Sequence, residues 1–472
     1  MPARVYIETY GCQMNVADSG LVGGVLRDAG YELCATPEGA DVVLVNTCAV
    51  RERAEERVYG RMTELWRHKQ RDPRVVLGLL GCMAEHLREQ ILARAPYVDL
   101  VMGPDAYRRL PELLAEARGA GARPHDPFVD VRLDRRESYE GLGAPVGDGV
   151  SAFVTVQRGC DKFCAFCVVP FTRGRERATP PREVLRQVRA LAAQGYREVT
   201  LLGQTVNSYR HEEADFADLL EAVAQVEGVA RIRFTSPYPV DFSPKLIATM
   251  ARLPKVCRHV HLPVQSGDDG VLARMGRGYT VAEFRALAAA LRAALPGVAL
   301  TTDVIVGFCD ETEDEYRATV RLLEELRFDA AFTFEYSERS GTPAARAMPD
   351  TVSTGVKRRR LAEIIALQEA ISLEAGRARI GAEVEVLVVG ASRRDAATLF
   401  GRTGDFKKVL LPAGEGRGPG ALVRVRVARA TGHTLFAEGV GSGAAAVPAA
   451  AVPAAAGAVA GVPVVASLPS MR

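Results

Sequence analysis

The chain has 472 residues, of which 48% are hydrophobic and 25% are charged. This composition is typical of folded globular domains and excludes a fibrous or wholly disordered chain, and the length predicts about three domains. Sixty Lys and Arg against 58 Asp and Glu leave a net charge of +2, so any nucleic-acid-binding surface must be local.

The chain begins without the apolar core of a signal peptide, and no segment is apolar enough to cross a bilayer. We therefore expect a cytoplasmic protein with no membrane contact, whose nine cysteines stay reduced. Residues 443–472 are rich in Ala and Pro, and their prolines interrupt helices. We expect this tail to be disordered.

Residues 2–119 alternate short apolar runs with helix-like stretches. Val5–Thr9, Val42–Asn46 and Val75–Leu80 predict buried strands, and Ala49–His68 predicts a helix with a charged face. Buried strands that alternate with helices predict a parallel α/β domain. Residues 120–145, rich in Gly, Pro and Asp, predict a linker.

Six further strands alternate with helices in residues 146–376. The predicted strands are Ala152–Val156, Glu198–Leu202, Arg231–Thr235, Arg258–Leu262, Ala299–Val306 and Ala330–Tyr336. Arg182–Gln194 predicts one of the helices between them, and a last helix runs from Lys357 to about Ala375. Because an eight-stranded barrel needs eight βα units, six predict a partial (β/α)6 barrel.

The pattern changes in residues 377–442, where apolar and polar residues alternate between glycine-rich turns. Glu383–Val389, Lys407–Leu411 and Leu422–Ala428 predict strands of a small antiparallel β-barrel. Residues 377–440 hold eleven Lys and Arg against six acidic residues, so this unit carries the local basic surface.

The strongest chemical signal is a Cys-x3-Cys-x2-Cys loop, directly after the first strand of the predicted barrel. Cys160, Cys164 and Cys167 can hold three irons of a 4Fe–4S cluster and leave the fourth iron open to a substrate group. A zinc site is the alternative, but zinc sites close with a fourth ligand at regular spacing.

Cys12, Cys48 and Cys82 each follow the end of a predicted parallel strand. Parallel strands deliver their C-terminal ends to one edge of the sheet, so these thiols can converge there on a second cluster. Cys34, Cys257 and Cys309 have no partner spacing and are expected to fill the core.

The cysteine loops and several further stretches resemble the methylthiotransferase family of the radical S-adenosylmethionine (SAM) superfamily. The resemblance extends from Val5 to Val440 and includes a C-terminal segment similar to a TRAM domain, an RNA-binding β-barrel. It rests on Thr9–Asn15, Asn46–Arg51, Gly81–Glu85, Cys160–Gly174, Leu202–Tyr209, His261–Gly267 and Gly401–Thr403.

The resemblance implies an enzyme that adds a methylthio group to carbon 2 of N6-isopentenyl (dimethylallyl) adenosine beside the tRNA anticodon. It assigns one 4Fe–4S cluster to Cys12, Cys48 and Cys82, and the SAM-binding cluster to the Cys160 loop. We expect tRNA and an electron donor such as flavodoxin or ferredoxin as partners of a monomer.

Two other functions stay open. Other branches of the family modify threonylcarbamoyl-adenosine in tRNA or an aspartate of a ribosomal protein, but the contexts Gln13–Asn15 and Met83–Glu85 favour the isopentenyl branch. A non-catalytic iron–sulfur RNA-binding protein is the alternative from another class.

The candidate SAM contacts are Phe166, Gln204, Asn207, Ser266 and Asp303. Phe166 has the superfamily's aromatic position beside the adenine, and shielding of the cluster is its alternative role. The other four lie at or near barrel-strand ends, where structural capping is the alternative to a contact with the methionine part or the ribose.

For RNA, the candidates in the TRAM segment are Arg402, Lys407 and Lys408, whose alternative is a solvated charged face. Arg173 and Arg175, beside the cluster loop, could hold tRNA phosphates or the SAM carboxylate.

One stretch departs from the family. After the fifth barrel strand the family commonly has Gly-Phe-Pro-Gly-Glu-Thr, whereas this chain has Cys309 and Asp310 in place of Pro and Gly. Because Pro and Gly set the dihedral angles of a turn, we expect an altered turn here.

Overall fold

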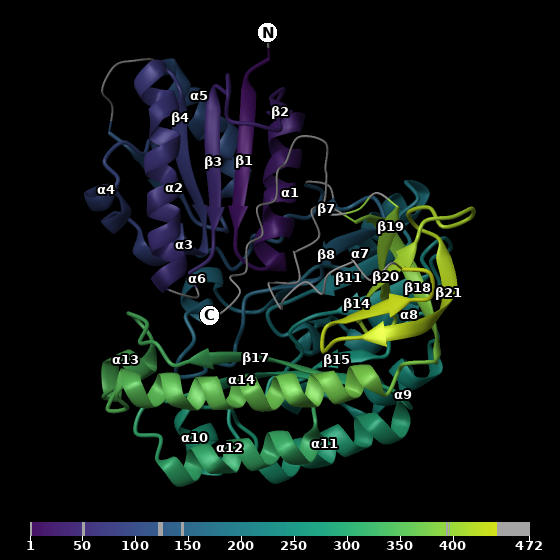
Figure 1. Cartoon of the computed structure of the whole chain (residues 1–472). Coiled ribbons are helices and arrows are strands. Elements are labelled where there is room, and N and C mark those ends of the chain that lie inside the picture. Colours follow the sequence, from purple (N-terminus) through teal and green to yellow (C-terminus); the bar gives the residue numbers. More distant parts are fainter. Residues whose placement is uncertain are drawn as a thin grey trace.

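The computed structural model of the chain describes residues 2–49, 52–120, 126–142, 146–392, 395 and 397–440. It contains an N-terminal α/β unit, a central βα unit and a C-terminal β-barrel, coloured purple, teal to green, and yellow in Figure 1. The predicted tail at residues 443–472 lies outside the described residues.

The N-terminal unit is a six-stranded parallel sheet between helices, as predicted. The strand order is β2-β1-β3-β4-β5-β6. The strands are β1 (Arg4–Tyr10), β2 (Glu32–Cys34), β3 (Val42–Thr47), β4 (Val76–Gly81), β5 (Leu100–Met102) and β6 (Phe128–Asp130). The helices are α1 (Gln13–Asp28), α2 (Glu52–Arg71), α3 (Cys82–Leu87), α4 (Gln90–Arg94), the 3-10 turn η1 (Tyr107–Arg109) and α5 (Leu110–Ala120). β3 and β4 are buried along their whole length, which explains their continuous apolar sequence.

The expected linker, residues 120–145, is wrong at one point. Phe128–Asp130 forms β6 and pairs in parallel with β5, so this segment completes the first sheet. Three residues are too short to give a periodic signal, and only the neighbouring strand reveals them.

The central unit is an open, partial barrel of six parallel strands, which confirms the predicted fold. The strands are β8 (Ser151–Thr155), β11 (Glu198–Leu202), β14 (Arg231–Phe234), β15 (His259–His261), β16 (Ala299–Val306) and β17 (Ala330–Glu335). They form two ladders, β14-β11-β8 and β15-β16-β17, which meet at a single bridge between Ile232 and Val256.

Helices cover the outside of this barrel, and the long α14 crosses beside β17 (Figure 1). The helices of the central unit are α6 (Val169–Arg173), α7 (Pro181–Ala193), α8 (Phe216–Ala224), α9 (Pro244–Arg252), α10 (Asp269–Arg274), α11 (Val281–Ala294), α12 (Glu313–Leu326), α13 (Pro343–Ala347) and α14 (Thr354–Arg377), with 3-10 turns η2 (Val206–Ser208) and η3 (Pro239–Asp241). Short strands complete the unit: β7 (Val146–Gly147), β9 (Gln157–Arg158), β10 (Arg177–Ala178), β12 (Arg210–His211) and β13 (Ala214–Asp215).

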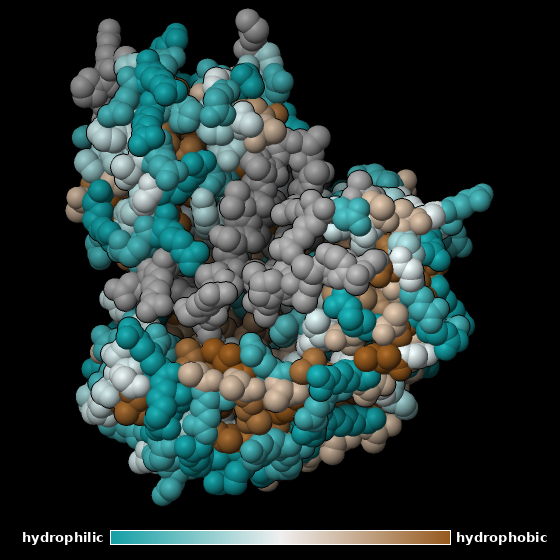
Figure 2. Space-filling model, in the orientation of Figure 1, coloured by the Kyte–Doolittle hydropathy of each residue, from teal (hydrophilic) through white to brown (hydrophobic). Residues whose placement is uncertain are grey.

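The open side of the barrel leaves part of its inner face exposed. Figure 2 shows hydrophobic side chains around β17 and α14, and Phe332 of β17 is 48% exposed. Phe332 pairs with Asp303 across the ladder, while the neighbouring Val304 packs into the core with the helices. Since alternate residues of a strand face opposite ways, Phe332 and Asp303 face the barrel interior.

The C-terminal unit is a closed five-stranded barrel. Its strands are β18 (Glu383–Ala391), β19 (Thr398–Thr403), β20 (Lys408–Pro412), β21 (Leu422–Ala430) and β22 (Thr434–Ala437). All pairs are antiparallel except β20 with β22, which is parallel.

The tip of the β19–β20 hairpin packs against the N-terminal ends of the central strands. Arg233 of β14 donates to the carbonyls of Thr403 and Gly404 at 2.7 and 3.0 Å. Phe406 stacks on His259, with ring centroids 5.1 Å apart. The hairpin therefore covers the end of the barrel opposite to the C-terminal strand ends.

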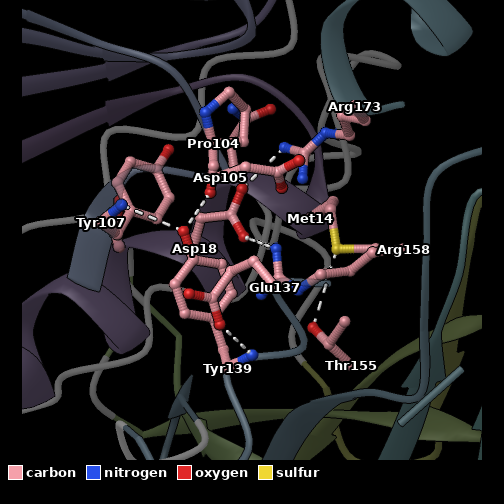
Figure 3. A network of polar contacts seen from close by, with 12 residues as sticks. Met14, Asp18, Pro104, Asp105, Tyr107, Glu137, Tyr139, Thr155, Arg158 and Arg173 are labelled. Carbon is pink, nitrogen blue, oxygen red and sulfur yellow. Dashed lines mark hydrogen bonds and ion pairs between the residues drawn. The ribbon is translucent and has the colours of Figure 1, made fainter. Parts of the chain in front are cut away.

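A buried carboxylate joins the N-terminal unit to the central one (Figure 3). The Asp18 oxygens, on α1, accept from Arg158 of β9 at 2.8 Å and from Arg173 of α6 at 2.7 Å. The three side chains are between 0% and 8% exposed. A buried charge is costly unless it is paired, so this contact fixes how the two units meet.

Two further arginines of the central unit contact the N-terminal unit. Arg177 pairs with Asp105 at 2.8 Å. Arg339 donates to the carbonyl of Ala49 at 2.7 Å and pairs with Glu55 at 3.1 Å. Together with the Asp18 contacts, they build this interface on charged hydrogen bonds.

Among the described residues, no helix combines the length and the apolar character that crossing a membrane requires.

We predict that Asp18→Asn destabilises the chain by about 3–5 kcal/mol, because it leaves two buried arginines without their carboxylate. Asp28→Asn, at the exposed end of the same helix, should change the free energy of unfolding by less than about 0.5 kcal/mol. Urea titration measures both, and equal stability of the two variants would contradict the interface.

The contacts of Asp18 with its two arginines also predict that the stability of the chain depends on pH. Burial alone would raise the Asp18 pKa, but Arg173 and Arg158 outweigh it and lower the pKa below its ordinary value. Asp18 thus contributes stability above the unfolded-state pKa of about 3.9, and this stability is lost as the pH falls through the lower folded-state value. Asp18→Asn should lack this acid-dependent part.

At the other interface, Arg233→Met should cost about 3–5 kcal/mol, because it strands the buried Glu198 carboxylate that Arg233 contacts at 2.7 Å. Arg426→Met, half-exposed on β21, is the control and should change stability by less than about 0.5 kcal/mol. Thermal unfolding measures the stability of both variants, and limited proteolysis measures how readily the C-terminal barrel is cleaved.

Candidate functional site

The Cys160 loop lies between β9 and α6, beyond the C-terminal end of β8. Gly159 has a φ of +76°, and a Cβ there would lie 2.0 Å from the carbonyl oxygen of Arg175, so only glycine fits. The Cys160 amide donates to the Gly174 carbonyl at 3.1 Å, and the Cys167 amide to the Cys164 carbonyl at 3.0 Å. These bonds fold the loop back on itself and bring its cysteines together.

Cys160 and Cys164 of this loop are buried, and Cys167 is partly buried. Burial raises the pKa of Cys160 to about 11 and that of Cys167 to about 12, and repulsion from Cys164 adds to both. Arg277 is 5% exposed and donates to the Cys164 sulfur at 3.2 Å. The loop thus pairs three thiols with one buried cation.

The other three cysteines also converge, at the C-terminal edge of the first sheet. Cys12 precedes α1, Cys48 follows β3, and Cys82 begins α3. The Cys48 amide donates to the Tyr10 carbonyl at 3.0 Å. A Cβ at Gly11 would lie 2.8 Å from the Cys48 Cβ, which shows how closely the two loops approach.

The thiols of this triad interact electrostatically with one another and with Arg173. The pKa of Cys12 is lowered to about 6, first by a hydrogen bond with Cys48 and further by the charge of Arg173. Burial raises the pKa of Cys82, and Arg173 opposes that rise. Arg173 donates from Nε to the Cys82 sulfur at 3.1 Å.

The two triads are in contact through apolar side chains. Ala49, Cys82 and Val168 form one small buried cluster. Ala49 follows Cys48 and Val168 follows Cys167, so each triad contributes a residue next to one of its cysteines.

The donor sets fit iron–sulfur clusters. Within the described parts of the chain, no three His, Cys, Asp or Glu side chains converge as ligands of a single metal ion. A 4Fe–4S cluster differs, because each thiolate binds a different iron and the ligands stay further apart. A 4Fe–4S cluster held by three thiols would have one iron without a cysteine ligand.

Three candidate SAM contacts lie near the Cys160 loop. Phe166 packs edge-on against Phe308, with centroids 6.4 Å apart. The Gln204 side-chain oxygen is buried without a hydrogen-bond partner in the described part of the chain. Asn207 bonds to both the amide and the carbonyl of Tyr238, which matches the structural role.

The other two SAM candidates, Ser266 and Asp303, lie in different surroundings. Ser266 is fully buried and bonds to Thr319 of α12 at 3.2 Å, so it faces the helix layer and cannot line the barrel interior. The expectation for Ser266 is therefore wrong in this structure. Asp303 faces the interior and accepts from His261 at 3.1 Å.

The unusual turn after β16 keeps a left-handed residue. Asp310 has a φ of +58°, a conformation that Asp tolerates better than most residues. Cys309 is buried, and its thiol donates to the Met348 carbonyl. The glycine of the family pattern is thus replaced by a residue that can adopt the same region.

Of the candidate RNA contacts on the C-terminal barrel, Lys407 is turned away from solvent and Arg402 is half-buried. Lys407 is 7% exposed and donates to the Asp329 carbonyl at 3.2 Å. The Arg402 guanidinium lies over the Phe406 ring at 4.8 Å, and its carbonyl accepts from Arg231. The expectation for Lys407 is wrong because this hairpin tip covers the base of the central barrel, whereas the half-buried Arg402 is in contact with Phe406 within the tip itself.

The remaining RNA candidates differ in how much solvent can reach them. Arg173 is 3% exposed and bound to Asp18 and Cys82, so it cannot meet a tRNA phosphate here. Arg175 is half-exposed, pairs with Asp161 and lies over Phe163. Lys408 is half-buried beside Phe400.

Sequence reasoning missed the charged residues that hold the triads. Asp18, Arg158, Arg277 and Arg339 follow no ligand spacing, and their partners lie far away in the chain. Asp18 gave the one usable signal, a lone acid in the otherwise uncharged stretch from Gln13 to Leu26.

Two family models match the chain. Residues 4–103 match the model described as uncharacterized protein family UPF0004, and residues 154–323 match the radical SAM superfamily. The matches cover most of the N-terminal unit and most of the central barrel.

Solved structures share the fold at low identity. A radical S-adenosylmethionine methyltransferase, TsrM, from Kitasatospora setae is 15% identical, with a TM-score of 0.53 over 73% of this chain and 75% of that one. The cobalamin-dependent S-adenosylmethionine radical enzyme OxsB is 12% identical, with a TM-score of 0.51 over 78% and 56%.

Several relatives similar along almost the whole chain carry the name tRNA-2-methylthio-N(6)-dimethylallyladenosine synthase. The protein from Chlorobium luteolum is 50% identical over 92% of this chain and 96% of its own length. That from Porphyromonas gingivalis is 45% identical over 92% and 94%. The chain belongs to this family of radical SAM synthases.

Proposed function

We propose that the chain adds a methylthio group to carbon 2 of N6-isopentenyl (dimethylallyl) adenosine beside the anticodon of tRNA. The observation that carries the proposal is similarity of 44–50% identity over nearly the full length of synthases with this name. The two thiol triads agree with it, since the reaction needs one site to cleave SAM and another to hold the sulfur.

Two 4Fe–4S clusters and SAM are the cofactors. We assign Cys12, Cys48 and Cys82 to the first cluster and Cys160, Cys164 and Cys167 to the SAM-binding one. When bound, these groups supply the methyl transfer and the radical chemistry. Such chemistry suits an aromatic C–H bond that no general base can deprotonate.

The chain's own residues bind, orient and shield. Phe166 and the unpaired Gln204 oxygen, beside the Cys160 loop, are our candidates for SAM, together with Asp303. The exposed Phe332 offers a flat apolar face on which the target base can stack.

For tRNA we retain Arg175 and Lys408, because phosphate contacts need cations that solvent can reach. An anticodon loop is partly unstacked already, so turning one base toward the barrel costs little. We further propose a monomer in the cytoplasm, reduced by a flavodoxin or ferredoxin, and domain boundaries near residues 119, 146, 377 and 442.

The test incubates isopentenylated tRNA with SAM and the reduced, anaerobically reconstituted chain, and then analyses the nucleosides by mass spectrometry. We expect 2-methylthio-N6-dimethylallyladenosine from the natural chain. Cys160→Ala should abolish both product and SAM cleavage, whereas Cys12→Ala should abolish the product and leave SAM cleavage.

Cys34→Ala is the matched control, since this buried thiol lies outside both triads, and it should keep full activity. Modification of threonylcarbamoyl-adenosine instead would assign the chain to another branch of the family. SAM left uncleaved by the natural chain would favour a non-catalytic iron–sulfur protein.

A further inference from the structure

One five-residue helix connects the two triads. α6 begins two residues after Cys167 and ends at Arg173. Its first flanking residue, Val168, packs on Cys82, and its last residue reaches the Cys82 sulfur. The segment that follows the SAM-binding loop therefore completes the wall of the other triad.

Arg173 is held too firmly for a surface role. Its Nη2 donates to Asp18 at 2.7 Å while its Nε donates to Cys82 at 3.1 Å, and its side chain is 4% exposed. The rigid fork of a guanidinium can make both bonds at once, which an ammonium cannot.

A third donor of the same side chain is unused. Arg173 Nη1 is buried and has no hydrogen-bond partner among the described residues. Buried donors in folded proteins are nearly always satisfied, so this one calls for an acceptor. A sulfur atom of a cluster held by Cys12, Cys48 and Cys82 would be such an acceptor.

We propose that Arg173 is a positioning residue of the first cluster: anchored by Asp18, it donates to the Cys82 sulfur and to the cluster, and so raises the reduction potential of that cluster. This inference rests on the proposed assignment of the cluster to Cys12, Cys48 and Cys82. It replaces the tRNA contact that the sequence predicted for Arg173.

The direction of the effect follows from charge. Reduction adds one electron to an anionic cluster, and a nearby cation or a hydrogen bond to sulfur stabilises the more negative state. Loss of the guanidinium should therefore make the cluster harder to reduce.

The chain supplies a control for the structural part of this contact. Arg158 is also buried and also bonds to Asp18, at 2.8 Å, but its guanidinium lies over the Tyr139 ring and donates to no cysteine among the described residues. Arg158→Gln and Arg173→Gln both break the Asp18 bridge, whereas only Arg173→Gln removes a donor to sulfur.

The experiment uses the full chain with Cys160→Ala, Cys164→Ala and Cys167→Ala, so that only the first cluster contributes. The cluster is titrated anaerobically with dithionite, which supplies the electron. Electron paramagnetic resonance measures the amount of reduced cluster. Arg173→Gln should lower the ratio of reduced to oxidised cluster at a fixed potential about tenfold, equivalent to about 59 mV for one electron.

Arg158→Gln should change that ratio by less than about threefold, and Arg173→Lys should give an intermediate loss. Equal shifts for Arg158→Gln and Arg173→Gln would overturn the inference, as would an unchanged potential in Arg173→Gln. If Arg173→Gln binds no iron, Arg173→Lys decides, and a potential equal to that of the parent overturns the role. A parent that binds no four-iron cluster would overturn the cluster assignment itself, and the inference with it.

Discussion

The carboxylate of Asp18 lies where three segments of the molecule meet. It is fully buried and bound by Arg158 and Arg173, which stand at the two ends of the segment that contains the Cys160 loop. A carboxylate in this position is stable only with both arginines in place. The orientation of the N-terminal unit on the central barrel is therefore fixed at the cysteines.

Parallel sheets provide the other half of the arrangement. Both units present the C-terminal ends of their strands to the shared interface, and at those ends loops can carry functional side chains without disturbing the core. Close loop approach at Gly11 and Gly159 lets each group of thiols gather. The charged interface then brings the two groups face to face, with Ala49, Cys82 and Val168 in contact between them.

Much of this could be predicted from the sequence, because period and spacing are local signals. Glu198–Leu202 and Ala299–Val306 form strands within the predicted bounds, and Cys12, Cys48 and Cys82 each lie just after a strand of the first sheet. Strand β6 escaped prediction because three residues carry no period, and pairing with β5 alone defines it.

The failures concern side chains whose surroundings are set by distant segments. Arg173 and Lys407 looked like surface cations in the sequence, yet Asp18 and Asp329 hold them at interfaces between units. Ser266 follows a barrel strand as expected, but Thr319 of α12 binds its hydroxyl. A charge count cannot distinguish a cation that meets solvent from one that closes an interface.

The central claim is that this interface holds two separate clusters, each on three thiols. Iron and acid-labile sulfide analysis with Mössbauer spectroscopy of the reconstituted full chain tests it most directly. The account predicts about eight irons per chain, falling to about four when either triad is replaced by alanine. About four irons in the natural chain, or zinc in place of iron, would contradict it.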